Sequence, residues 1–356
     1  MRILYIGWAD HVHVSRWVSY FANAGHKTWV LSTQQGRIPG STVYQMRTKH
    51  RGLRLQAQEL KIYAKLFRAD IVHAHWASFG ALPALAGIKP YVVTAWGSDI
   101  YRFHEFSCES QDAIRLGLTG ADIVTVDSAD LKKEVEKLGV KREKVEVVQW
   151  GVDTSLFQPG PANQSVVEQL QIAGKRIIYS PRNLDQIYNQ DIVLQAFASV
   201  VQKAPDAVLI QKHYRKTSNE INDYLEKARQ YGVEAHMRLV GDMDYSLLPD
   251  LYRMADVVIS VPSFDGTPMS ILEGMACGAV PIVSDLPSLR EWISDGENGF
   301  LVPIRNMDAL ADRLLRVLDD EVLRKRISPE NVSLVQRIGN HDKNMMAMER
   351  LYRAIL

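Results

Sequence analysis

Residues 256–284 read DVVISVPSFDGTPMSILEGMACGAVPIVS, and this stretch decides the fold. An apolar run (256–263) leads into a turn at Gly266, a helical stretch that ends at Gly278, and a second apolar run. Short runs rich in β-branched residues on either side of a helix are typical of a strand-helix-strand unit in a parallel sheet. The stretch therefore predicts an α/β protein.

The same alternation continues outward in both directions. The expected buried strands are RILYIG (2–7), KTWVLS (27–32), ADIVHAHW (69–76), YVVTAWG (91–97), ADIVTVDS (121–128) and VEVVQWG (145–151), then KRIIYS (175–180), DAVLIQ (206–211), HMRLVG (236–241), DVVISV (256–261) and AVPIVS (279–284). Helical patterns lie between them, such as the one that begins at Ser128 and ends at Gly139. Pro159-Gly160-Pro161 separates the two groups and is the expected linker.

We therefore predict two doubly wound α/β domains, residues 1–160 and 170–335, followed by an amphipathic helix over 340–356 whose docking stays open. Two such domains are expected to face each other across a cleft at the carboxyl ends of their strands, where ligands of this architecture bind. Functional side chains are then expected directly after strands.

The composition narrows the class of protein. The chain has 356 residues, 46% of them apolar and 23% charged, with a net charge of +1, which does not indicate a nucleic-acid partner. Cys108 and Cys277 are far apart and predict neither a disulfide framework nor a zinc site, so a reducing cytoplasm is the expected location. The apolar start is too short for a signal peptide, and no apolar run is long enough to span a membrane.

Two carboxylates lie in the loop and helix after residue 263. Asp265 precedes the expected start of the helix, and Glu273 lies in its second turn. One interpretation makes Asp265 a helix cap and Glu273 a solvated acid; the other makes both of them ligand-binding groups. The N–H groups of Thr267, Met269 and Ser270 at the helix start would form an anion site, and Gly266 would let a ligand approach the backbone.

Several motifs resemble the retaining glycosyltransferases of family 4, which have the GT-B fold. They are PSFDGTPMSILEGMACG (262–278), VPIVSDLPSLREWISDGENGFLVP (280–303), GVDTSLFQP (151–159), RLVGDMDYSLLPDLYRMADVVIS (238–260) and SPRNLDQIYNQDIVLQAF (180–197). The motifs cover the whole second domain in the order that the family has, whereas the first domain matches more loosely. The resemblance implies two Rossmann-like domains, the first on the acceptor side and the second for the nucleotide sugar.

The resemblance also implies roles in donor binding. Glu273 matches the glutamate that accepts the ribose hydroxyls, and Asp265 matches the acid that contacts the donor hexose. Arg182 matches the arginine that neutralises the diphosphate, together with backbone amides near Met269 and Ser270. A guanidinium and helix amides spread the charge of a departing diphosphate without a metal.

Two departures affect the donor side. The family usually has a lysine soon after the arginine, where this chain has Tyr188 and Asn189. Lys212 is a candidate for the missing charge, although it reads equally well as a solvated loop lysine. The first acid is Asp265, one methylene shorter than the glutamate that is more common in the family.

The first domain offers candidates at the ends of its strands. His73 and His75 alternate in one strand, so both are expected on the same face, from which both could face the cleft, and His75 matches the active-site histidine of the family. TAWGSD (94–99) resembles a family motif, with Trp96 in the place of a histidine and Asp99 retained. The usual Gly-Gly pair is absent, and three other residues stand in its loop: Gly7, His11 and His13.

Neither a metal nor a bound cofactor is expected. Asp242-Met243-Asp244 looks like the metal motif of another glycosyltransferase fold, but the resemblance assigns this loop to the surroundings of the nucleobase. The nucleoside diphosphate sugar would be a co-substrate.

Residues 47–68 carry an excess of positive charge. Seven basic residues face one acid, Glu59: Arg47, Lys49, Arg51, Arg54, Lys61, Lys65 and Arg68. The run is either a solvated face or a surface that docks reversibly on an anionic bilayer, at about 1 kcal/mol per basic residue. In the second case the protein would be peripheral on the inner face of the membrane.

We expect a retaining, metal-independent glycosyltransferase that moves a hexose from a nucleoside diphosphate sugar to the hydroxyl of a glycan or lipid-linked acceptor, in surface polysaccharide or glycolipid synthesis. One alternative is a nucleotide-sugar epimerase of the same fold, against which the spacing of Asp265 and Glu273 and the GVDTSLF motif argue. The other is a nucleotide-sugar-binding protein without turnover, which the missing lysine and Gly-Gly pair leave open.

Overall fold

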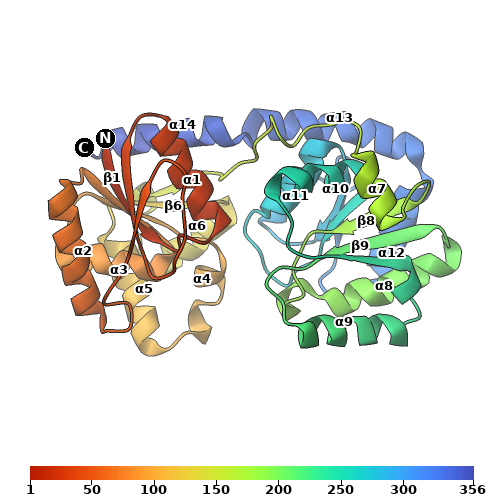
Figure 1. The fold of residues 1–356 in the computed structure, drawn as a ribbon, viewed down its shortest axis with the longest axis horizontal. Helices are drawn as coiled ribbons and strands as arrows, with labels where there is room; N and C mark the ends of the chain where they lie inside the picture. Colours follow the sequence, from red (N-terminus) through yellow and green to blue (C-terminus); the bar gives the residue numbers. More distant parts are fainter. The chain divides into compact units, whose positions relative to one another are not determined.

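The structure is a computed structural model that describes residues 1–356 (Figure 1). It divides into unit 1, which is Met1–Trp150 with His341–Leu356, and unit 2, which is Gly151–Asn340. The boundary lies before the segment expected as a linker, because Arg253 of unit 2 donates hydrogen bonds to the backbone oxygens of Leu156 and Gln158. The segment after Trp150 is therefore part of unit 2.

Unit 1 contains a seven-stranded parallel sheet in the order β3-β2-β1-β4-β5-β6-β7. Its strands are β1 (Arg2–Gly7), β2 (Lys27–Ser32), β3 (Thr42–Gln45), β4 (Ile71–His75), β5 (Tyr91–Thr94), β6 (Ile123–Val126) and β7 (Val145–Val147). Its helices are α1 (Val12–Asn23), α2 (Leu53–Phe67), α3 (Ala81–Ala86), α4 (Ser98–Tyr101), α5 (Cys108–Gly120), α6 (Ala129–Lys137) and α14 (His341–Ala354). Within unit 1, α1 packs with α14 on one face of the sheet, and α2, α3 and α5 pack together on the other (Figure 1).

The C-terminal helix α14 completes the core of unit 1. Tyr352 is fully buried, and its ring lies 5.1 Å from that of Phe21 on α1. Its hydroxyl accepts a hydrogen bond from Trp17 Nε1 at 3.4 Å and contacts His73 on β4. The helix whose docking the sequence leaves open therefore belongs to the first domain.

Unit 2 contains a six-stranded parallel sheet in the order β10-β9-β8-β11-β12-β13. Its strands are β8 (Arg176–Ser180), β9 (Ala207–Lys212), β10 (Met237–Val240), β11 (Val257–Ser260), β12 (Val280–Ser284) and β13 (Phe300–Val302). Its helices are α7 (Gln164–Leu170), α8 (Gln190–Lys203), α9 (Ser218–Gln230), α10 (Leu248–Met254), α11 (Met269–Cys277), α12 (Met307–Asp319) and α13 (Glu321–Ile338). In this unit α8 packs with α12, and α11 packs with α10 and α13.

The two sheets share one topology. In each, the chain runs outward in one direction from the first strand and then returns to the other side, so the order reverses between β1 and β4 and between β8 and β11. Such a reversal, or switch point, leaves room for a ligand beyond the carboxyl ends of the two strands. The predicted fold class, two doubly wound α/β domains, is confirmed.

The helix signals in the sequence are reproduced in detail. Ser128 caps α6 by accepting a hydrogen bond from the N–H of Leu131 at 3.1 Å, and Gly278 ends α11 with a φ of 96°.

Both cysteines are free thiols. None of the helices combines the length and the apolar character that crossing a membrane requires.

Candidate functional site

An ion pair lies at the switch point of unit 2. Arg182 follows β8, Asp265 follows β11, and the guanidinium Nη2 is 2.9 Å from the carboxylate Oδ2. Their side chains are only 13% and 19% exposed. Burial raises the pKa of the Asp265 carboxyl, and the positive charge of Arg182 opposes that shift. The structure thus brings together two of the residues proposed for the donor.

The residues in the place of the family lysine support this ion pair. The ring of Tyr188 lies under the Arg182 guanidinium at 4.2 Å, within the range of a cation-π contact. The amide of Asn189 donates to the backbone oxygen of Val261 at 2.8 Å and to Ser263 Oγ at 3.1 Å. Asn189 therefore ties the loop after β8 to the loop after β11.

The start of α11 lies beside Arg182. Pro268 is the residue before the first turn of α11, and Arg182 Nη1 is 3.5 Å from Ser270 Oγ. The N–H groups of Met269 and Ser270 have no acceptor within the helix, as at any helix start. Asp265 does not cap this helix, so the first interpretation of Asp265 is wrong.

Glu273 is buried on α11 and is held by two tyrosines. Its carboxylate accepts a hydrogen bond from the Tyr252 hydroxyl at 2.9 Å and another from the Tyr245 hydroxyl at 3.3 Å. The interpretation of Glu273 as a solvated acid is therefore wrong as well. The two tyrosines come from the segment between β10 and β11, and nothing in the spacing of the sequence assigns them to Glu273.

Lys212 is the last residue of β9 and is partly buried. Burial lowers the pKa of its ammonium group, and the negative charges of Glu273 and Asp242 oppose this shift. Lys212 is thus not a solvated loop lysine, and it adds a positive charge near Glu273.

The Asp-x-Asp motif has a local structural role in this loop. The Asp244 carboxylate accepts hydrogen bonds from the N–H of Ser246 at 2.8 Å and from its hydroxyl at 2.7 Å. No three His, Cys, Asp or Glu side chains of the chain gather as a group of metal ligands.

In unit 1, His75 ends β4 with its imidazole buried. Gly7 makes room for it, because a Cβ at Gly7 would lie 3.3 Å from that of His75. Neither ring nitrogen of His75 has a hydrogen-bond partner, and burial lowers the pKa of His75 to about 3. His75 is therefore a neutral imidazole with unused hydrogen-bonding capacity.

His73 lies on the same face of the sheet as His75, but its ring nitrogens are hydrogen-bonded. The two rings stack at 4.4 Å, which agrees with the predicted alternation. His73 Nε2 bonds to Thr94 Oγ1 at 2.7 Å, and its Nδ1 is bonded to the Tyr352 hydroxyl. His73 is therefore a core residue with both ring nitrogens hydrogen-bonded, and only His75 keeps its ring nitrogens without partners.

Asp99 is fully buried and clamps two loops together. Its carboxylate accepts hydrogen bonds from the N–H of Ala77, after β4, at 2.8 Å and from the N–H of Trp96, after β5, at 2.9 Å. Burial raises its pKa to about 6, against the opposing effect of these N–H groups. Asp99 therefore positions backbone in the proposed acceptor side.

The remaining acceptor-side candidates surround Trp96. The ring of His11 lies 4.5 Å from that of Trp96, and His13 lies 4.4 Å from Trp150. Trp150 also contacts Trp96 at 5.3 Å. The sequence identifies Trp96 and His13 but misses Trp150.

Comparison with known proteins agrees with this architecture. Residues 164–332 match the family model of glycosyl transferases group 1, and residues 2–128 match that of glycosyl transferase 4-like proteins. The phosphatidyl-myo-inositol mannosyltransferase of Mycobacterium tuberculosis is 27% identical over 301 residues, 80% of this chain and 74% of that one. The N-acetyl-alpha-D-glucosaminyl L-malate synthase of Bacillus anthracis is 22% identical over 306 residues, 84% of this chain and 78% of that one.

Among solved structures, the Anabaena protein HepE in complex with UDP has a TM-score of 0.85 at 17% identity, covering 99% of this chain and 100% of that one. The two parallel sheets and this likeness define the fold as GT-B. Both matching models describe glycosyltransferases, one over most of unit 2 and the other over most of unit 1, so the chain is a glycosyltransferase, which confirms the resemblance seen in the sequence.

Proposed function

We propose that unit 2 binds a nucleoside diphosphate sugar through the charged cluster, which is Arg182, Lys212, Asp265 and Glu273. The observation that carries this proposal is the partly buried Arg182 beside the start of α11, because a guanidinium next to unpaired helix N–H groups suits a diphosphate. Only part of the guanidinium fork is occupied by Asp265 and Ser270, so donors remain for phosphate oxygens.

The two acids of the charged cluster would bind the sugar rings of the donor. Glu273, fixed by Tyr245 and Tyr252, is suited to accept hydrogen bonds from the ribose hydroxyls. Asp265, next to the diphosphate-binding arginine, is suited to the hexose. The HepE structure with UDP and the mannosyltransferase among the relatives support a nucleotide-sugar donor.

The transfer proposed is retaining and independent of a metal. The acceptor hydroxyl attacks the anomeric carbon from the face that the diphosphate leaves, and the departing phosphate oxygen takes the proton of that hydroxyl. Arg182 and the N–H groups of α11 stabilise the negative charge on the leaving group and so lower the barrier. No protein group forms a covalent bond or takes a proton in this step.

A thermal-shift panel of UDP, GDP and ADP sugars tests donor binding, because a bound donor stabilises the folded state by mass action. At least one donor is expected to raise Tm, and the same change should be absent in Arg182→Ala. Nuclear magnetic resonance of the product then shows the anomeric configuration. An inverted product, or activity that disappears with a chelator and returns with a divalent cation, would contradict this mechanism.

The acceptor proposed is a glycan or lipid-linked glycan in surface polysaccharide or glycolipid synthesis, reached from the cytoplasmic face of a membrane. On unit 1, α2 exposes three apolar side chains at helical spacing, Leu55, Ile62 and Leu66. Their neighbours at Arg54, Lys61 and Lys65 are exposed and basic. A stripe of apolar residues beside a stripe of cations suits the surface of an anionic bilayer.

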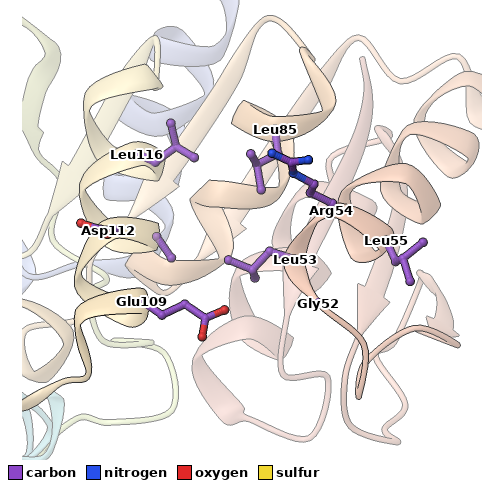
Figure 2. A pocket seen from close by; sticks show the side chains of 9 residues that line it. Gly52, Leu53, Arg54, Leu55, Leu85, Glu109, Asp112 and Leu116 are labelled. Atoms are coloured by element: carbon purple, nitrogen blue, oxygen red, sulfur yellow. The ribbon is translucent and has the colours of Figure 1, made fainter.

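A pocket next to this stripe extends the apolar surface. It has a volume of about 650 Å³ and lies between α2, α3 and α5. Figure 2 shows Leu53, Leu85 and Leu116 pointing toward it, with Arg54 on one rim and Glu109 on the other. We propose that this face of unit 1 makes the reversible membrane contact.

Vesicle flotation tests the contact with anionic, neutral and high-salt samples. Binding is expected to anionic vesicles only, to weaken with salt, and to fall in Ile62→Glu with Leu66→Glu. Val322→Glu changes an isolated residue on α13 that is 80% exposed, so it is the matched control. Equal recovery with neutral and anionic vesicles would overturn the contact without affecting the proposal for the donor.

A further inference from the structure

Four of the seven tryptophans gather at the carboxyl edge of the sheet in unit 1. With two histidines they form the aromatic cluster, defined as Trp8, Trp76, Trp96, Trp150, His11 and His13. Trp8 directly follows β1 and Trp76 directly follows β4, the two strands that flank the switch point. The cluster therefore occupies the place in unit 1 where a doubly wound fold binds its ligand.

The rings form a continuous group. Trp8 lies 5.1 Å from Trp76 and 5.6 Å from Trp96, and Trp76 lies 5.7 Å from Trp96, between ring centroids. These three tryptophans remain partly exposed to solvent. A core cluster would bury its rings completely, whereas a binding surface leaves part of them exposed, and that is the arrangement observed.

Polar atoms without partners lie among these rings. The indole N–H groups of Trp96 and Trp150 are buried and donate to no acceptor, and both ring nitrogens of the adjoining His75 are in the same state. Trp150 is 8% exposed and His75 is 1% exposed. Buried polar groups are nearly always hydrogen-bonded, so unpartnered groups at one site indicate a polar ligand that completes them.

The backbone at Trp76 has a strained conformation. Trp76 has a φ of 86° and a ψ of 130°, a region that residues other than glycine rarely adopt. Its N–H donates to the backbone oxygen of Thr94 at 2.9 Å, and Asp99 holds the next residue, Ala77, in place. Strain that the surroundings enforce in this way is characteristic of binding sites.

We propose that the aromatic cluster is a subsite for a neutral pyranose ring of the acceptor. The faces of indole rings carry partial negative charge, which attracts the C–H groups on one side of a pyranose. The unpartnered indole N–H groups and the His75 imidazole then bond to its hydroxyls. The six side chains include no lysine or arginine, which disfavours a phosphorylated inositol or a dicarboxylate. That the bound sugar is the acceptor rests on the proposed function, whereas the binding of a sugar at this cluster does not.

The test is saturation-transfer NMR on the full-length chain with neutral methyl glycosides of glucose, galactose and mannose and with neutral disaccharides. Malate and inositol 1-phosphate are the anionic competitors, and each sample is measured with and without UDP. Trp76→Ala removes one ring, and Trp96→Phe and Trp150→Phe keep a ring but remove one N–H. Trp29→Phe changes a tryptophan that stacks on Phe67 outside the cluster and is the matched control.

At least one neutral glycoside is expected to bind, with a Kd at least fivefold weaker in each cluster variant and unchanged in Trp29→Phe. The shift of Tm by the nucleotide sugar should persist in all of these variants. If Trp76→Ala does not fold, as its Tm shows, the two phenylalanine variants decide the outcome. No binding by any neutral glycoside, preferential binding of the anions, or unchanged binding in the variants would overturn the subsite. If the wild-type chain binds a neutral glycoside but no nucleotide sugar raises its Tm, the proposed function is overturned and the subsite is not.

Discussion

The switch points of the two units have the same strand topology and opposite chemistry. In unit 2 the loops after β8 and β11 carry a partly buried ion pair, Arg182 and Asp265. In unit 1 the loops after β1 and β4 carry indole rings, with Trp8 and Trp76 5.1 Å apart. Strand order thus determines where the switch point lies in each unit, and the first residues after each strand determine its chemistry.

The difference also concerns how each cluster is stabilised. In unit 2 Arg182 and Asp265 form an ion pair and Glu273 accepts hydrogen bonds from two tyrosines, because a charge taken from water needs a partner. In unit 1 the groups are aromatic rings, and several polar atoms of Trp96, Trp150 and His75 have no partner. Arg182, Asp265 and Glu273 thus have partners within unit 2, whereas the buried polar atoms at the aromatic cluster do not.

The largest expected effect is that of Arg182→Ala. Loss of a charge-assisted contact to the leaving diphosphate should cost more than about 2 kcal/mol of transition-state stabilisation, or about 30-fold in kcat/KM. Arg176→Ala is the matched control, because Arg176 lies at the other end of β8 and pairs with Asp206. A variant that retains most of its kcat/KM would show that Lys212 or the amides of α11 suffice.

Asp265→Asn should mainly lower kcat, by about 20-fold. The hexose gains positive charge during transfer, and the carboxylate of Asp265 stabilises that charge. Asp265→Glu should keep partial activity with an altered preference among donor sugars, because the pocket holds a shorter side chain. Steady-state kinetics with varied donor measure both. Normal kcat in Asp265→Asn would leave unit 2 without the catalytic role that distinguishes it from unit 1.

Glu273→Gln should raise the donor KM about tenfold and leave kcat nearly unchanged, because ribose is held equally in the ground and transition states. Glu226→Gln, which changes an exposed acid on α9, is the control. Tyr252→Phe should produce a smaller effect in the same direction, since it removes one of the hydrogen bonds that fix Glu273. A change in kcat alone would contradict the assignment to ribose.

The smallest effect concerns the pH dependence of stability in unit 1. The pKa of Asp99 is raised to about 6 in the folded state, so folded protein binds this proton more tightly than unfolded protein. That contribution to the free energy of unfolding is present at low pH and is lost as pH rises through 6. From about pH 5 to about pH 6.5, wild-type protein should lose about 1 kcal/mol relative to Asp99→Asn. Urea unfolding at both pH values measures it, and parallel curves would contradict the raised pKa.

The sequence predicts the longer strands and the capped helices, because their signals are local. It misses β3 and β13, which have four and three residues and carry little periodicity. In the charged cluster it identifies Arg182, Asp265 and Glu273 through motif spacing. It misses Tyr252 and the contact of Tyr188 with Arg182, because these contacts depend on how separate elements pack. The sequence names Trp96, His11 and His13 but misses the aromatic cluster as a group, since its four tryptophans follow four different strands.

The docking of α14 also sets the order in which the protein can fold during synthesis. Unit 1 is discontinuous, so Trp17 and Phe21 lack the cover of Tyr352 until the ribosome has made all of unit 2. At roughly 5–20 residues per second, those roughly 200 residues take about 10–40 s. Unit 2 can reach its native state during elongation, while the nascent first unit keeps an apolar surface open to chaperones until its last helix arrives.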